Sequence, residues 1–110
     1  MKELRKVYLE NNKLVRIEPN LFKGLNNVEG IYLQNNQLIK IESNSFENLK
    51  NLKEIWLSYN KIISVDRFVF VGLFKLEKVY IGFNPISLAQ SDILETICFT
   101  NSKCNVIINE

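Results

Sequence analysis

The chain has 110 residues, of which 46% are hydrophobic and 24% are charged, and its formal net charge is +2. A chain of this length and composition is expected to fold as one compact unit, and so small a net charge argues against disorder and against a polyanion as partner. No apolar stretch approaches the roughly 18 residues that a membrane-spanning helix needs.

The amino end leads directly into patterned sequence, with no signal peptide before it. We therefore expect either a mature domain that was excised from a longer precursor or a cytosolic protein. The pattern also starts without a cap, so Leu4, Val7 and Leu9 are expected to form an open edge of the core. Such an edge belongs to a fragment, or it meets a partner or a second copy of the chain.

The dominant feature is a repeat whose copies begin near residues 4, 28, 52 and 76, so that each copy starts 24 residues after the one before it. Two apolar columns run through all four copies: Val7, Ile31, Ile55 and Val79, then Leu9, Leu33, Leu57 and Ile81. They alternate with other residue types, as the side chains of a half-buried strand do. Because the four strands are separated by whole repeats, we expect them to pair in parallel, about 4.8 Å apart.

Two further columns run through the copies, the last of which is incomplete. An asparagine column, made of Asn12, Asn36, Asn60 and Asn84, lies where each strand ends. An amide at this place can donate to and accept from backbone groups that the sheet leaves unsatisfied. Phe22, Phe46 and Phe70 lie in the return half and are expected to stack behind the sheet. The columns predict an α/β solenoid with a parallel sheet on its concave face and irregular or short helical turns on its convex face.

The carboxyl-terminal residues 87–110 leave the repeat and are expected to cap the four copies of residues 1–86. An apolar face over residues 87–99, with Asp92 as N-cap, predicts a capping helix, and residues 106–108 predict a strand at the sheet edge. The third copy also carries an added apolar group on its convex side, made of Phe68, Val69, Val71 and Phe74. Either the capping helix covers this group, or it forms a second binding surface or a dimer contact.

The columns read L-x-x-V/I-x-L-x-x-N-x-L/I-x-x-I/V-x-x-x-x-F-x-x-L from residue 4 to about residue 86. This pattern resembles the phenylalanine-containing class of leucine-rich repeats found in Toll-like receptors, Slit-like guidance proteins, small proteoglycans and insect secreted immune proteins. The resemblance implies protein recognition by a secreted protein or a receptor ectodomain. A cytoplasmic regulatory or effector module is the alternative.

The caps of that class commonly carry four cysteines, whereas this tail has only Cys98 and Cys104. In an oxidising compartment the two thiols are expected to close a short loop, because cysteines six residues apart across a turn can meet. In a reducing compartment both are expected to be free thiols.

The outward-facing strand positions are the candidate ligand-binding residues, because they project from the scaffold and are not needed for the core. One column is aromatic throughout: Tyr8, Tyr32, Trp56 and Tyr80. A neighbouring column adds Tyr59 and Phe83, and Lys6, Glu54 and Lys78 flank the other side. Aromatic side chains of this kind are enriched at interface hot spots. The alternative is that the rings only support the sheet, since aromatics favour strands and stack across them.

Other functions find little support in the sequence. There is no histidine to act as a base, no glycine-rich phosphate loop and no cysteine and histidine spacing typical of a metal site, so we expect neither an enzyme nor a cofactor nor a metal. Basic residues are mixed with acids, which argues against nucleic acid, and no basic amphipathic helix suggests a membrane. The sequence therefore predicts a protein-binding module, with self-association through the amino edge as the rival.

Overall fold

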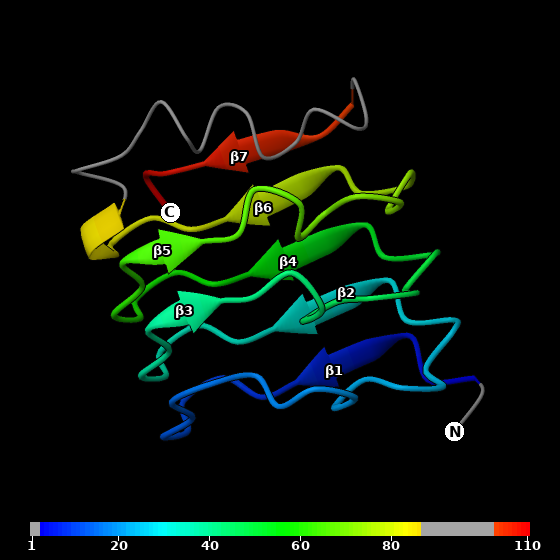
Figure 1. Ribbon diagram of the computed structural model, residues 1–110, viewed down its shortest axis with the longest axis horizontal. Coiled ribbons are helices and arrows are strands. Elements are labelled where there is room, and N and C mark those ends of the chain that lie inside the picture. The colour runs from blue at the N-terminus through cyan, green and yellow to red at the C-terminus, as the bar shows by residue number, and fades with distance from the viewer. Residues whose placement is uncertain (1–2, 87–102) are drawn as a thin grey trace.

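The computed structural model describes residues 3–86 and 103–110, and its backbone winds as a solenoid of about four turns (Figure 1). One parallel sheet contains five strands in the order β1, β2, β4, β6, β7. Their bounds are Lys6–Tyr8, Gly30–Tyr32, Glu54–Trp56, Lys78–Tyr80 and Asn105–Ile107. A second parallel sheet pairs β3, Lys40–Ile41, with β5, Ser64–Val65.

The strands of the first four turns pair in the register that the repeat predicts. Val7 aligns with Ile31, Ile31 with Ile55, and Ile55 with Val79. Ile31, Ile55 and Val79 are completely buried, and so are most of the leucines in the next column. Each inward column therefore forms one continuous row of the core, and the predicted solenoid is confirmed.

The asparagine column forms the predicted ladder inside the bend that follows each strand. Asn60 Nδ2 donates to the carbonyls of Leu33, Leu57 and Ser58 at 3.1, 3.0 and 3.2 Å, and its Oδ1 accepts from the Leu38 amide at 3.0 Å. Asn36 and Asn84 likewise bond both their own repeat and the preceding one, whereas Asn12 bonds carbonyls of its own repeat. Because a buried backbone group without a partner is costly, the ladder fixes the bend in every repeat.

The phenylalanine column stacks on the opposite side of the core. Phe22 and Phe46 have ring centroids 6.0 Å apart, and Phe46 and Phe70 6.2 Å apart. Neighbouring strands are only about 4.8 Å apart, so the repeats spread toward the phenylalanines. This wedge curves the solenoid and leaves the five-stranded sheet on the concave side. The convex segments around residues 19–24, 43–48 and 67–72 are successive turns, as expected.

Two columns adopt a left-handed backbone, and they are filled differently. On the convex side the column holds Gly24, Asn48 and Gly72, at φ of 83, 68 and 85°. Glycine and asparagine are the residues that tolerate this conformation best. In the bend after each concave strand the column holds Asn11, Asn35, Tyr59 and Phe83, at φ of 56 to 59°. The bend imposes the same backbone on all four repeats, although only the first two have a residue suited to it.

The carboxyl end extends the main sheet. Strand β7 covers Asn105–Ile107, close to the predicted 106–108, and aligns Val106 with Val79. Cys104 packs against the core and is not a free thiol. Cys98 and the predicted helix over 87–99 lie outside the described residues, so the pairing of the two cysteines, the cap and the boundary at residue 86 stay predictions.

Candidate functional site

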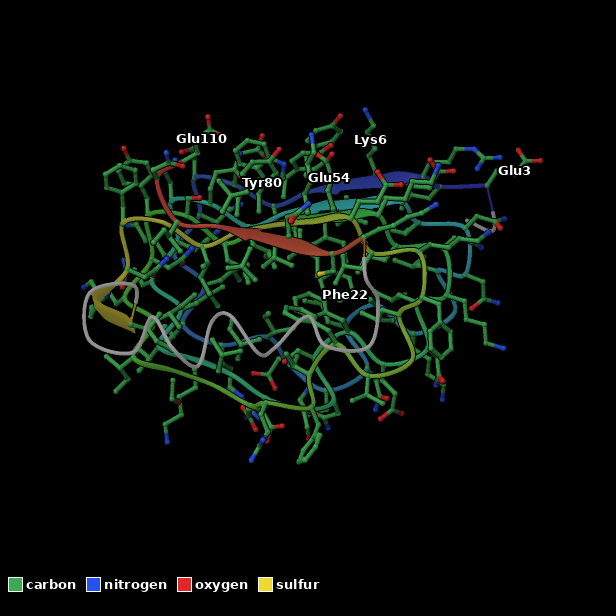
Figure 2. The ribbon with its side chains drawn as sticks, turned by 90° about the horizontal axis from the view of Figure 1, so that it is seen from above. Glu3, Lys6, Phe22, Glu54, Tyr80 and Glu110 are labelled. Atoms are coloured by element: carbon green, nitrogen blue, oxygen red, sulfur yellow. The ribbon has the colours of Figure 1, made fainter. Side chains whose placement is uncertain are left out.

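Four aromatic side chains form a ladder on the concave face, on the side of the sheet that points away from the core. The register places Tyr8 beside Tyr32, Tyr32 beside Trp56, and Trp56 beside Tyr80. All neighbouring rings stack, with centroids 4.7, 6.4 and 3.6 Å apart in that order. Figure 2 shows that Tyr80 and Glu54 lie on one side of the sheet, whereas Phe22 lies behind it. We call this group, Tyr8, Tyr32, Trp56 and Tyr80, the aromatic ladder.

A carboxylate in the middle of the face holds two of the rings in place. Glu54 Oε1 accepts hydrogen bonds from the Tyr32 hydroxyl at 3.0 Å and from Trp56 Nε1 at 2.8 Å. Tyr32 reaches this oxygen because Gly30 lies between them: a Cβ at Gly30 would be only 3.0 Å from the Tyr32 hydroxyl. Because Gly30 has no side chain, Glu54 can bond to both Tyr32 and Trp56 and orient their rings. We call this arrangement the clamp at Glu54.

The same clamp changes the acidity of Tyr32. The pKa of Tyr32 is raised from 10.0 to about 12, most by burial and further by the hydrogen bond to Glu54 and the negative charge of Glu54. Burial and a nearby negative charge both disfavour the phenolate. The hydroxyl therefore stays protonated and remains a donor to Glu54 at every physiological pH.

Exposure of the aromatic ladder falls along the solenoid. Tyr8 is 60% exposed, Tyr32 and Trp56 are half-buried, and Tyr80 is only 7% exposed. One face of Tyr80 is covered by Trp56, and on its other side the register partner is Ile107 of β7. Tyr80 therefore offers little surface to a ligand and acts mainly as a support for Trp56.

Tyr59 and Phe83 restore the exposed aromatic surface at the carboxyl-terminal end. Each is 53% exposed, and their rings stack at 4.4 Å with an angle of 7° between the planes. Both have the left-handed backbone described above, which is an outlier for bulky side chains and costs roughly 1 to 3 kcal/mol per residue. We call these two residues the aromatic pair. The fold maintains two strained positions whose side chains face solvent.

The end of the chain crosses the outer surface beside β6. Ser58 Oγ donates to the carbonyl of Glu110, and an added Cβ at Gly82 would be only 2.5 Å from the carbonyl oxygen of Ile108. The outward column at this place is Glu10, Gln34, Ser58 and Gly82. Its side chains become smaller toward the carboxyl end, and this taper makes room for the tail.

The charged flanking residues take different roles. Lys6 and Lys78 are exposed, whereas Glu54 is half-buried and bound to two rings. The repeat pattern indicates neither this bridging role nor the tail contacts. In the sequence, Gly30 and Gly82 interrupt columns of larger residues, and these two glycines point to the places where other groups come close. Among residues 3–86 and 103–110 no cluster of metal-ligating side chains occurs, and no helix there is long and apolar enough to cross a membrane.

The convex apolar group is only partly buried. Val69 belongs to the core at 2% exposure, whereas Phe68, Val71 and Phe74 are each more than half exposed. Phe74 also has an interaction partner within the chain. The predicted cover, a helix over 87–99, falls outside the described residues, so its contact with this group stays a prediction.

Comparison with known proteins identifies the repeat. The sequence profile of the family described as leucine rich repeat matches residues 2–54 and 31–86, so most of the chain is covered. No curated protein sequence matches the chain. Among solved structures, a chain of the Toll–Spatzle complex, described as a molecular hub in Drosophila development and innate immunity, superposes with a TM-score of 0.80 at 22% identity. That match covers 94% of this chain and 15% of the Toll complex chain.

A second structure, the TLR13–ssRNA13 complex, superposes with a TM-score of 0.70 at 24% identity over 92% of this chain. The chain spans only 14% of that chain's length, so both comparisons concern a small part of a much longer chain. They support the same backbone arrangement that the strand register and the asparagine ladder show. The chain belongs to the leucine-rich repeat family.

Proposed function

We propose that the chain is a recognition module, and not a catalyst, which binds a protein or peptide ligand through its concave face. The ligand-contacting residues are Tyr8, Tyr32, Trp56, Tyr59 and Phe83. Tyr80 supports Trp56 from behind, and Lys6, Glu54 and Lys78 adjust specificity and association rate. We further propose an extracellular setting, as part of a secreted protein or receptor ectodomain. The Toll complex supports this setting by its fold alone.

The observation that carries the proposal is the combination of exposure and rigidity on this face. Stacking fixes all the rings, and Glu54 fixes Tyr32 and Trp56 further. A ligand would therefore meet aromatic surfaces that lose little side-chain freedom on binding. Large aromatic side chains held in this way are the usual hot spots of protein interfaces. Support of the sheet alone does not explain why the strained aromatic pair faces solvent.

The test uses random peptides displayed on phage and selected against the whole chain. Selected peptides should bind Trp56→Ala more weakly by about 2 kcal/mol or more, which is the loss expected for an aromatic hot spot. Val71→Ala, an exposed change on the convex side, is the matched control and should leave affinity unchanged. Circular dichroism would show that both variants are folded. Unchanged affinity of folded Trp56→Ala for every selected peptide would refute the proposal.

A further inference from the structure

Three apolar side chains form an exposed column on the bend that joins the two sheets. Val15 is 53% exposed, Ile39 38% and Ile63 53%. Positions 36 and 38 of the same bend point into the core, as do 60 and 62, so alternate positions point outward. The three side chains therefore lie in a row along the flank of the solenoid, one per repeat.

Strand formation alone does not account for this column. Ile39 and Ile63 immediately precede β3 and β5, and the Ile63 amide donates to the Ile39 carbonyl at 2.9 Å. A β-branched residue suits such an extended backbone. Threonine has the same branch and a polar surface, however, so the backbone does not require an apolar side chain. Apolar residues scattered singly over a surface are ordinary, but a row in register across three repeats is a contiguous surface.

Lysines accompany this row. Lys13, Lys40 and Lys61 are exposed beside it, and none of them forms an ion pair with the residues that the structure describes. The nearest acidic column is already compensated in part, because Arg16 pairs with Glu18 at 3.6 Å and with Glu42 at 3.5 Å. We call Val15, Ile39, Ile63, Lys13, Lys40 and Lys61 together the flank strip. Its charge complements an acidic partner.

The distance between neighbouring repeats favours one secondary structure for the partner segment. The backbone of Ile63 bonds that of Ile39, so neighbouring repeats at the flank strip have the spacing of paired strands, about 4.8 Å. A helix that runs along the solenoid presents one apolar residue every turn, or about 5.4 Å, which is close to this spacing. An extended strand repeats one face every two residues, or about 6.7 Å, and loses register over three repeats.

We propose that the flank strip binds an acidic amphipathic helix of a partner protein, with one apolar residue per turn of that helix contacting one repeat. Helices commonly dock on grooves and ridges in this way, through anchors one turn apart. An anionic membrane is less well matched, because clusters that recognise such surfaces usually contain about four to eight basic residues. This surface is separate from the aromatic ladder, so the proposal goes beyond ligand binding at the concave face.

The experiment uses two synthetic helical peptides of about 14 residues, or four turns, with leucine once per turn. One peptide carries glutamate and the other lysine at the positions beside the leucines. Fluorescence anisotropy with the whole chain should show the acidic peptide binding at least about tenfold more tightly than the basic one. Ile39→Thr/Ile63→Thr keeps the β-branched backbone preference and should weaken the acidic peptide by about tenfold or more.

Two controls make the result specific. Lys13→Glu/Lys61→Glu should remove the preference for the acidic peptide, while Trp56→Ala should leave its affinity unchanged and so separate this surface from the concave face. Three outcomes would overturn the proposal: no binding of either peptide, equal binding of both, or equal affinity for the threonine variant. Binding to vesicles of equal parts phosphatidylcholine and phosphatidylserine, lost in the threonine variant, would also overturn it by assigning the flank strip to membranes.

Discussion

The first two repeats and the last two share one backbone but present different surfaces on the concave face. Tyr8 at the amino end is 60% exposed, whereas Tyr80 at the other end is 7% exposed. In the bend that follows, the first two repeats have asparagine where the last two have the exposed Tyr59 and Phe83. In the first repeat the exposed aromatic side chain belongs to the aromatic ladder, and in the last two repeats exposed aromatic side chains lie in the bend instead.

This difference separates the residues that build the scaffold from those that give it a surface. The inward columns change little from repeat to repeat, because each must fill the same space against its neighbours. The outward columns do not fill the core, and they are where the halves of the molecule differ. A substitution in one half can therefore be compared with the substitution at the equivalent position of the other half, which serves as its control.

The largest effect is expected in the asparagine ladder. Asn60→Ala would remove three donor bonds and one acceptor bond in a buried bend, and should lower the free energy of unfolding by about 3 kcal/mol. Asn12 is exposed and, within residues 3–86 and 103–110, its side chain bonds only to carbonyls of its own repeat, so Asn12→Ala should cost less than about 1 kcal/mol. Urea denaturation measures both. Equal losses would show that the ladder does not bind successive repeats together.

The next largest loss of stability is expected where the carboxyl-terminal tail packs against Gly82. Gly82→Ala places a Cβ against the backbone of Ile108 and should cost about 1 to 2 kcal/mol as the tail moves away. Hydrogen exchange should increase over residues 105–110 and at Tyr80, and stay unchanged at β1. Gly30→Ala is the matched control, because the nearest atoms to its added Cβ belong to the Tyr32 ring; it should disturb the bond of Tyr32 to Glu54 but leave exchange over residues 105–110 unchanged. Unaltered exchange in the tail of Gly82→Ala would contradict the contact.

A smaller effect is expected from making the two halves alike at the strained bend. Tyr59→Asn/Phe83→Asn gives the last two repeats the residue type of the first two, which relieves backbone strain but removes one exposed ring stack. Relief of roughly 1 to 3 kcal/mol of strain at each residue is opposed by the lost stack and by the lost burial of two rings that are 53% exposed, so thermal unfolding should show a change within about 1 kcal/mol. Affinity for the selected peptides should nevertheless fall. A loss of stability above about 2 kcal/mol would mean that the aromatic pair is structural.

The smallest effect is a pKa change within the aromatic ladder. Glu54→Gln removes the negative charge beside Tyr32, so its pKa should fall from about 12 part of the way toward 10.0, with burial retaining the rest. Because the folded pKa lies above the unfolded one, this contribution to stability is complete below pH 10 and is lost as the pH rises toward 12. Absorbance titration of the tyrosines measures the shift. If the pKa of Tyr32 were the same in Glu54→Gln as in the unchanged chain, Glu54 would have no influence on that hydroxyl.

The sequence predicts the scaffold well because its columns report packing. The register of Val7, Ile31, Ile55 and Val79, the asparagine ladder and the phenylalanine stack all follow from residue types that recur every repeat. The sequence also predicts an edge strand near residues 106–108, one residue from its observed place.

The surface was less predictable, because it depends on contacts between repeats and not on the pattern within one. The burial of Tyr80 depends on Trp56 and β7, and the clamp at Glu54 depends on the absence of a side chain at Gly30. The left-handed backbone of Tyr59 is imposed by the bend, although its own side chain disfavours it. Each of these features depends on residues from more than one column, so no single column of the repeat predicts it.

The most direct test of the central claim uses Trp56, the one tryptophan in the sequence, which lies in the middle of the concave face. Its fluorescence should change saturably as a peptide selected against the chain is titrated in, and the half-point should agree with the affinity measured by anisotropy. Acrylamide should quench it less in the complex, because the bound peptide covers the ring. Saturating binding that leaves both the emission and the quenching of Trp56 unchanged would place the ligand elsewhere and contradict the account.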